Sequence, residues 1–87
     1  MRLIGREKLN PLRGKGADVE KWTRSWVAEV AGAHWRQPND VIGQFPNAHH
    51  QGHGCFMFPI GRCQLAIKLQ IAFAQGIALI SELNQTK

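Results

Sequence analysis

The segment that most constrains the fold is 63–73, CQLAIKLQIAF, in which apolar and polar residues alternate. Its odd positions are all apolar, and its even positions are all polar or small. An alternation with a period of two is typical of a β-strand that has one buried face. We therefore predict a central strand from Cys63 to Phe73, with the odd side chains in the core and the even side chains on a face that is free for function.

Two shorter apolar segments flank this strand. Cys55–Ile60, CFMFPI, is predicted to be a strand in which Pro59 indicates an edge position or a bulge, because proline has no N–H to donate. Gly61-Arg62 is the expected two-residue hairpin turn. After a turn at 74–76, Ile77–Leu83 is the last predicted strand. The three strands together predict an antiparallel meander.

The strongest helical pattern covers Asp18–Ala31. Trp22, Trp26 and Val30 are spaced four residues apart, which places them on one apolar stripe, and Gly32 is a suitable stop. Two tryptophans on one stripe would supply much of the core when they pack on a sheet. Stacking of either indole on a nucleic-acid base is the alternative.

The remaining segments are less regular. Met1–Ile4 is predicted to be a brief first strand or an extended arm, and Arg6–Arg13 a short or broken helix, because it contains a proline. Asp40–Gln44 is expected to form a short helix, and Asn47–Gly54 an irregular loop. Helices that precede a meander must pack on its apolar face, so the predicted fold class is α+β, a small antiparallel sheet packed against N-terminal helices.

Length and composition limit the possible classes of protein. A chain of 87 residues is one domain, and no window approaches the roughly 18 apolar residues that a membrane span requires. The N-terminus lacks the apolar core of a secretory signal, so a cytoplasmic location is expected. Cys55 and Cys63 have no CxxC spacing, which favours two reduced, partly buried thiols over a disulfide or a thiolate zinc site.

The net charge is +5, and a small basic domain often binds a polyanion such as nucleic acid or an acidic protein partner. Mere solubility is the alternative. Lys21 and Arg24 lie off the tryptophan stripe and are therefore expected to be exposed. Lys68 on the even face of the central strand and Arg62 at the preceding turn could contact phosphates, although each could equally be a solvated charge.

Three histidines, His49, His50 and His53, occur together in the loop NAHHQGHG. The spacing HHxxH could bind zinc, but the loop contains glycines and has no nearby carboxylate or cysteine pair, so we expect neither a native metal nor a cofactor. Because imidazole can exchange protons near neutral pH, a histidine that acts as general acid or base in RNA cleavage is the functional alternative to a solvated loop.

Residues 24–48 resemble the middle of the HigB-type toxins of bacterial type II toxin–antitoxin modules. That family has an aromatic residue followed by a segment of the form xPxDVxxxFPxA, and then a hairpin of strands. The matching residues here are Trp35, Pro38, Asp40, Val41, Phe45, Pro46 and Ala48. The opening MRLIGREKL is also similar to the N-terminal strand and first helix of the family.

This resemblance implies a RelE-like fold and a metal-independent mRNA interferase, an endoribonuclease that cleaves mRNA, commonly on the ribosome. It also implies a cognate antitoxin, of the helix-turn-helix type, as inhibitor. Where the family carries an arginine in the central strand, this chain has Leu65 and Ala66. We therefore nominate other groups: His50, His53 and Arg62 as catalytic residues, and Arg36, Lys68, Arg24 and Lys21 as RNA-binding residues. A catalytically inactive RNA- or protein-binding relative of the same fold is the alternative.

Overall fold

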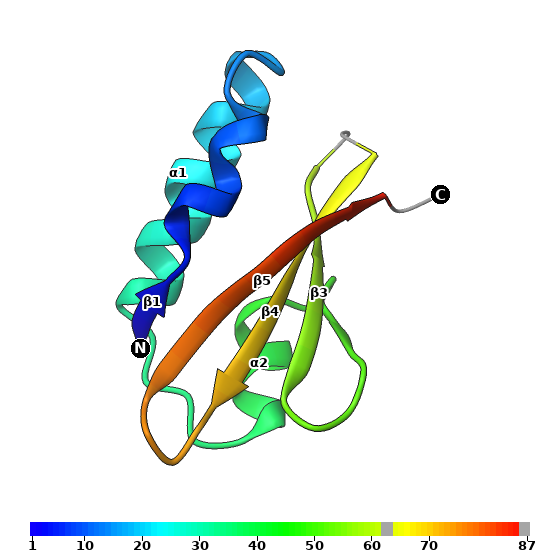
Figure 1. Cartoon of the computed structure of the whole chain (residues 1–87). Coiled ribbons are helices and arrows are strands. Elements are labelled where there is room, and N and C mark those ends of the chain that lie inside the picture. The colour runs from blue at the N-terminus through cyan, green and yellow to red at the C-terminus, as the bar shows by residue number, and fades with distance from the viewer. Residues whose placement is uncertain (62–63, 86–87) are drawn as a thin grey trace.

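The predicted central strand is present and lies in the middle of a five-stranded sheet of order β1-β5-β4-β3-β2 (Figure 1). The computed structural model describes residues 1–61 and 64–85. The strands are β1 Arg2–Ile4, β2 His49–His50, β3 Cys55–Pro59, β4 Leu65–Ala72 and β5 Ile77–Gln85. The fold class is therefore α+β, as predicted.

The antiparallel meander is confirmed for β3, β4 and β5, but the whole sheet is mixed. β1 runs parallel to β5, with Leu3 opposite Ala78. A parallel pair needs a long connection, and here almost the entire chain lies between the two strands. The N-terminal ammonium group donates a hydrogen bond to the carbonyl oxygen of Ala33 (2.6 Å), which holds the start of β1 against the segment after the long helix.

The burial of β4 follows the predicted alternation. Its buried odd residues are Ile67, Leu69 and Ile71, whereas Gln70 and Ala72 are exposed. The exception on the even face is Ala66, which is only 2% exposed because its small side chain lies between its cross-strand partners Pro59 and Asn84. The strand begins at Leu65, and the predicted start, Cys63, lies outside the described residues.

The β3–β4 hairpin is closed by a hydrogen bond from the Ile60 N–H to the carbonyl oxygen of Leu65 (3.0 Å). Its connection therefore occupies 61–64 and is longer than the predicted two-residue turn, of which Arg62 is outside the described residues. The Ile60 N–H points to β4, so the nitrogen of the preceding residue, Pro59, points away from β4. On that outer side of β3, the short strand β2 pairs with Phe56 and Met57 and does not extend to Pro59. Pro59 thus occupies an unpaired stretch of edge, as its missing N–H predicted.

The helical segments also follow the sequence pattern, with boundaries shifted by one or two residues. α1 covers Ala17–Ala31, and the irregular N-terminal helix, η1, is a 3₁₀ helix over Arg6–Leu12. α2 covers Pro38–Gln44 and starts before the predicted Asp40. Proline suits the first helical turn because the N–H that it lacks would have no partner there. The Asp40 carboxylate instead accepts a hydrogen bond from the backbone N–H of Arg36 (2.8 Å).

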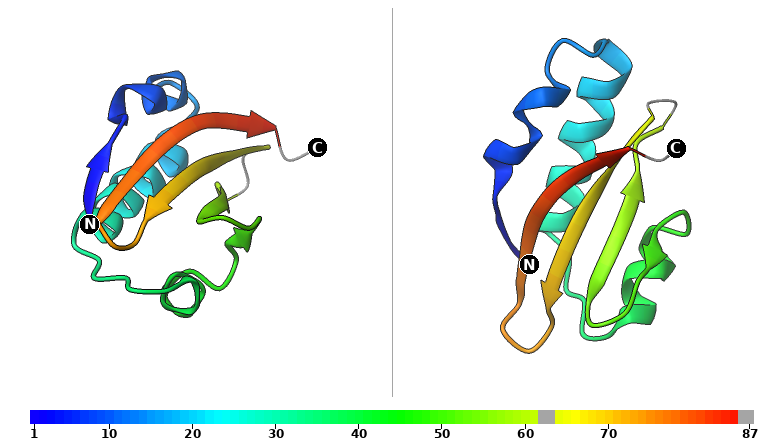
Figure 2. Two further views of the ribbon diagram at one scale, coloured as in Figure 1. Left: turned by 60° about the horizontal axis from the view of Figure 1, so that its bottom comes forward. Right: turned by 45° about the vertical axis from the view of Figure 1, so that its right-hand side comes forward.

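α1 and α2 lie on the same side of the sheet, and the other side is left open (Figure 2). The apolar stripe of α1 enters the core through Trp26 and Val30, both buried, while Trp22 is half-buried. The edge of Trp26 meets the ring of Phe58 on β3, with centroids 5.4 Å apart. The tryptophans therefore supply core packing, as predicted. No helix in the described ranges is long and apolar enough to cross a bilayer.

The prediction of an irregular loop over Asn47–Gly54 is wrong at its centre, because His49 and His50 form the short strand β2 against β3. Without β2, the backbone of β3 would have an unpaired edge there, and such an edge offers hydrogen-bond partners to an adjacent extended segment. After β2 the chain reverses through His53 (φ 53°) and Gly54 (φ 76°). This reversal is fastened to β4 by a hydrogen bond from the Gln70 side-chain amide to the carbonyl oxygen of His53 (2.6 Å).

Candidate functional site on the open face of the sheet

Three titratable side chains from different strands share one row across the open face. The strand registers pair His49 with Met57, Met57 with Lys68, and Lys68 with Glu82. Directly opposed residues in an antiparallel sheet project from the same face. We call His49, Met57, Lys68 and Glu82 the cross-strand row. It lies on the even face of β4, where the alternation predicted that function could reside.

Glu82 belongs to this row only because β5 contains a bulge. Leu69 is paired with Ile80 and the next residue of β4, Lys68, with Glu82, so that Ser81 is an extra residue in β5. Ile80 is fully buried on the helix-covered face. With a strict period of two, Glu82 would follow Ile80 onto that buried face. The bulge instead moves the carboxylate to the open face, where it is exposed.

The row has the composition of an acid–base site with a central cation. Neighbouring strands lie about 4.8 Å apart, so Lys68 has Glu82 on one side and, beyond Met57, His49 on the other. His49 and Glu82 are exposed and Lys68 is half-buried. A carboxylate, an ammonium group and an imidazole in this order could act on a phosphate placed over Lys68 from two opposite sides.

Side chains beside the row are held by contacts to neighbouring strands. The Asn84 amide lies 3.7 Å from the Met57 sulfur. The Gln70 amide, which holds the carbonyl of His53, connects β4 with the reversal that follows β2. Through this contact the short strand that carries His49 is attached to the centre of the sheet.

The two histidines nominated from the sequence lie elsewhere. His50 is adjacent to His49 but pairs with Phe56, and its ring stacks on that of Phe56 with centroids 4.5 Å apart on the helix-covered side. His53 is an exposed residue of the reversal. The third nominated catalytic residue, Arg62, is outside the described residues. The structure therefore does not bring His50 and His53 together with Lys68.

The nominated cations are also dispersed, except for Lys68. Lys21 and Arg24 are exposed on α1, as predicted, on the layer opposite the open face. Arg36 is exposed in the connection between α1 and α2, beside a shallow depression that it shares with Met1 and Gly76. Of these four residues, only Lys68 belongs to the cross-strand row.

Sequence reasoning missed His49 and Glu82. Nothing in the sequence of the loop distinguishes His49 from His50 and His53, because a strand of two residues has no recognisable pattern. A signal for Glu82 does exist, because the apolar residues Ile80 and Leu83 are three apart and so interrupt the alternation of β5. A break of this kind is typical of a bulge, and it could have predicted that Glu82 faces away from the core.

Within residues 1–61 and 64–85, no three histidine, cysteine, aspartate or glutamate side chains come together as metal ligands would. Cys55 is a half-buried free thiol. No family model matches this chain, and no match was found among curated proteins. The function of the chain is therefore inferred from the residues of the row, the charge of the chain and the resemblance of residues 24–48.

Proposed function

We propose that the protein is the toxin of a type II toxin–antitoxin module, a RelE-like mRNA interferase that cleaves mRNA on the ribosome without a metal ion. The observation that carries this proposal is the cross-strand row, which places a carboxylate and an imidazole on either side of Lys68. The net charge of +5 supports binding to a polyanion. The resemblance of residues 24–48 to HigB-type toxins supports the choice of RNA as substrate.

Metal-independent cleavage of RNA needs a base, a cation and an acid. We assign Glu82 to remove the proton from the ribose 2′-hydroxyl, whose oxygen then attacks the adjacent phosphorus. Lys68 stabilises the added negative charge of the pentacoordinate phosphorane. His49, as imidazolium, gives its proton to the departing 5′-oxygen. The bond from phosphorus to that oxygen breaks, which leaves a 2′,3′-cyclic phosphate and a 5′-hydroxyl end.

The positions of Glu82 and His49 suit an in-line displacement at phosphorus. The attacking and departing oxygens lie on opposite sides of the phosphorus in an in-line displacement. Glu82 and His49 lie on opposite sides of Lys68 along the row. The open face has no helix over it, so a single strand of RNA can reach all three residues (Figure 2).

We further propose that the partners are mRNA, the ribosome and a cognate antitoxin of the helix-turn-helix type, all in the cytoplasm. The test is induced expression in bacteria that lack the antitoxin, followed by mapping of cleaved mRNA ends. We expect arrested growth, and cleavage by purified protein and ribosomes that persists in the presence of 1,10-phenanthroline, which binds transition metals but leaves the Mg²⁺ that ribosomes require. His34→Ala, which removes an exposed histidine far from the row, is the matched control and should keep the activity.

Normal growth while folded protein accumulates would contradict the nuclease proposal. In that case the chain would be a catalytically silent RNA- or protein-binding domain of the same fold. Retention of RNA at low salt would then indicate the RNA-binding alternative. Cleavage that 1,10-phenanthroline abolishes would contradict the metal-independent mechanism alone.

A further inference from the structure

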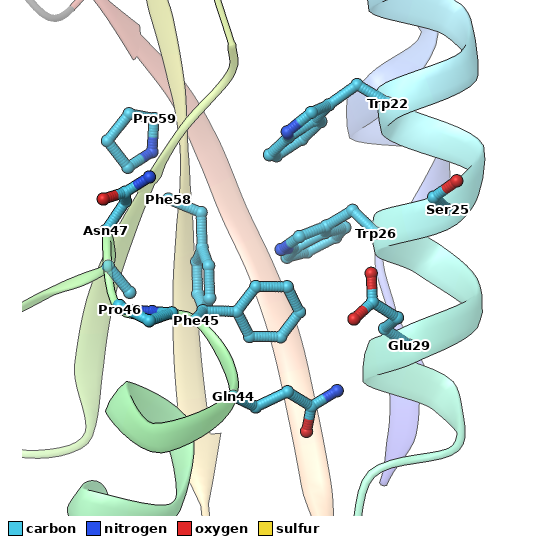
Figure 3. Close-up of a pocket in the computed structure, with 11 residues that line it drawn as sticks. Trp22, Ser25, Trp26, Glu29, Gln44, Phe45, Pro46, Asn47, Phe58 and Pro59 are labelled. Atoms are coloured by element: carbon cyan, nitrogen blue, oxygen red, sulfur yellow. The ribbon is translucent and has the colours of Figure 1, made fainter.

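A groove lies between α1 and the segment that follows α2, on the side of the sheet opposite the cross-strand row (Figure 3). We call it the tryptophan groove. It encloses about 260 Å³, and its α1 side is formed by Trp22, Trp26 and Glu29. Its other side is formed by residues 44–48 and by Phe58 and Pro59. This volume is below the usual range for a drug-sized ligand and suits a single planar ring system.

Beside the groove lies a buried hydrogen-bond donor for which the described residues supply no acceptor. Trp26 is 1% exposed, and its Nε1 has no hydrogen-bond partner among the described residues. In Figure 3 the nitrogen edge of this indole is directed across the groove, away from α1. Buried polar groups in folded proteins are almost always paired, so an unpaired N–H beside a groove indicates an acceptor that arrives with a ligand. Because Trp26 Nε1 has almost no accessible surface, that acceptor can reach it only when the groove widens on binding.

The same groove offers a flat surface and an acceptor. The rings of Trp22 and Trp26 are nearly parallel, with centroids 6.3 Å apart and planes 10° apart, and Trp22 is half-buried. Glu29 is exposed at the margin and is the one charged residue among those that line the groove within the described chain. Its carboxylate would repel a phosphate but can accept hydrogen bonds from a neutral ring.

The groove leads toward one residue of the proposed active site, His49. A second depression, of about 460 Å³, shares Trp22, Pro59 and the segment 46–48 with the tryptophan groove and extends to His49. His49 belongs to the cross-strand row. A strand of RNA bound across the row could therefore pass over the edge at β2 and place a neighbouring base in the groove.

We propose that the tryptophan groove binds one unpaired nucleobase of the RNA, stacked on Trp22. As the groove widens to admit the base, a carbonyl oxygen of the base accepts the hydrogen bond from Trp26 Nε1, and an N–H of the base donates to Glu29. This inference rests on the proposed function, because it assumes an RNA strand at His49. Splayed bases stacked on aromatic rings are the usual means of recognising single-stranded RNA. Adenine is the base without a carbonyl oxygen, so the groove should discriminate against it.

The test is an NMR titration of the full chain, in which the indole N–H signals are assigned with Trp22→Phe and Trp26→Phe. The probes are the 5′-monophosphates of guanosine, uridine and adenosine, with ribose 5-phosphate as the probe that lacks a base. We expect the guanosine and uridine nucleotides to shift the Trp22 and Trp26 signals saturably. The adenosine nucleotide should bind about tenfold more weakly, and ribose 5-phosphate should leave both signals unchanged.

Glu29→Gln replaces the charged acceptor at the exposed margin by a neutral amide oxygen and should leave the fold intact, since Glu29 is exposed. It should weaken the binding of guanosine and uridine monophosphate about tenfold, because a hydrogen bond to a charged acceptor is stronger than one to a neutral acceptor. Glu20→Gln removes an exposed carboxylate from the same helix outside the groove, and it should change nothing.

Equal shifts with ribose 5-phosphate would overturn the proposal in favour of a phosphate site. Saturation by N-acetyl-arginine amide without response to nucleotides would overturn it in favour of a protein-docking groove. The absence of any saturable shift would also overturn it. Cleavage of RNA without base binding here would contradict this inference alone, whereas base binding without toxicity would contradict the nuclease proposal and leave the groove assignment supported.

Discussion

Glu82 lies directly opposite Lys68 on the open face of the sheet because Ser81 is an extra residue in β5. After the bulge, each residue of β5 faces the side opposite to the one that a regular alternation would give it. Leu83 therefore packs against the core, and Glu82 points outward. One inserted residue thus preserves the core and also places a carboxylate beside a cation. This relationship is the basis of the catalytic role that we propose for Glu82.

Glu82→Gln should reduce RNA cleavage about 100-fold or more and leave folding unchanged. The amide keeps the size of the side chain but cannot accept the 2′-hydroxyl proton, and general base catalysis contributes at least this factor. The measurement is the initial rate on ribosome-bound mRNA. Glu20→Gln, an equally exposed change on α1, should retain the rate of the parent protein. Equal rates for both variants would remove Glu82 from the mechanism.

His49→Ala should abolish growth arrest, whereas His50→Ala should retain it. The two residues are neighbours in β2, but only His49 faces Lys68 across Met57, and His50 stacks on Phe56. The measurement is the number of viable cells after induction, compared between variants that accumulate similar amounts of folded protein. Loss of toxicity in His50→Ala or His53→Ala, with His49→Ala fully toxic, would instead support the catalytic residues nominated from the sequence.

Deletion of Ser81 should be tolerated, at a cost of about 1–2 kcal/mol in the free energy of unfolding. Removing the extra residue leaves Ile80 opposite Leu69 and Glu82 opposite Lys68 in a regular ladder. Deletion of Gln70, from the regular part of β4, should prevent folding, because it sends every following side chain to the wrong face. Urea denaturation monitored by tryptophan fluorescence compares the two. Equal damage from both deletions would show that Ser81 has another structural role.

Gly54→Ala should destabilise the protein more than Gly14→Ala. Both glycines have positive φ, 76° and 82° respectively, a conformation that costs other residues about 1–2 kcal/mol. A Cβ at Gly54 would in addition lie 2.5 Å from the carbonyl oxygen of Ile71, whereas a Cβ at Gly14 meets no atom within 4 Å. The carbonyl of Gly54 also accepts the hydrogen bond from the Ile71 N–H (2.8 Å) that fastens the reversal to β4. Thermal melting of both variants measures the difference.

Trp26→Ala should lower the free energy of unfolding by about 3–5 kcal/mol, the usual cost of removing a large buried aromatic side chain. Trp26 is 1% exposed and packs edge-on against Phe58. Trp22→Ala should cost less, because Trp22 is half-buried. Denaturation in urea compares the two variants. A larger loss for Trp22→Ala would contradict the assignment of Trp26 as the core anchor and of Trp22 as the accessible ring.

The sequence predicted the elements whose pattern is local. The alternation of Ile67, Leu69 and Ile71 identified β4, and the four-residue spacing of Trp22 and Trp26 identified α1. The pattern did not identify the partners of these elements. The parallel pairing of β1, the formation of β2 and the start of α2 at Pro38 all depend on contacts that no local period contains.

In the candidate site, too, one property follows from the local pattern and the others from contacts between strands. The sequence by itself determined that Lys68 faces away from the core, because its neighbours Ile67 and Leu69 must be buried. Only the tertiary structure decided that His49 and Glu82 share its row. The face of a side chain is fixed within its own strand by the pleat, but the residues beside it are fixed by registers between strands far apart in the chain. A single bulge can change such a register without any change in composition.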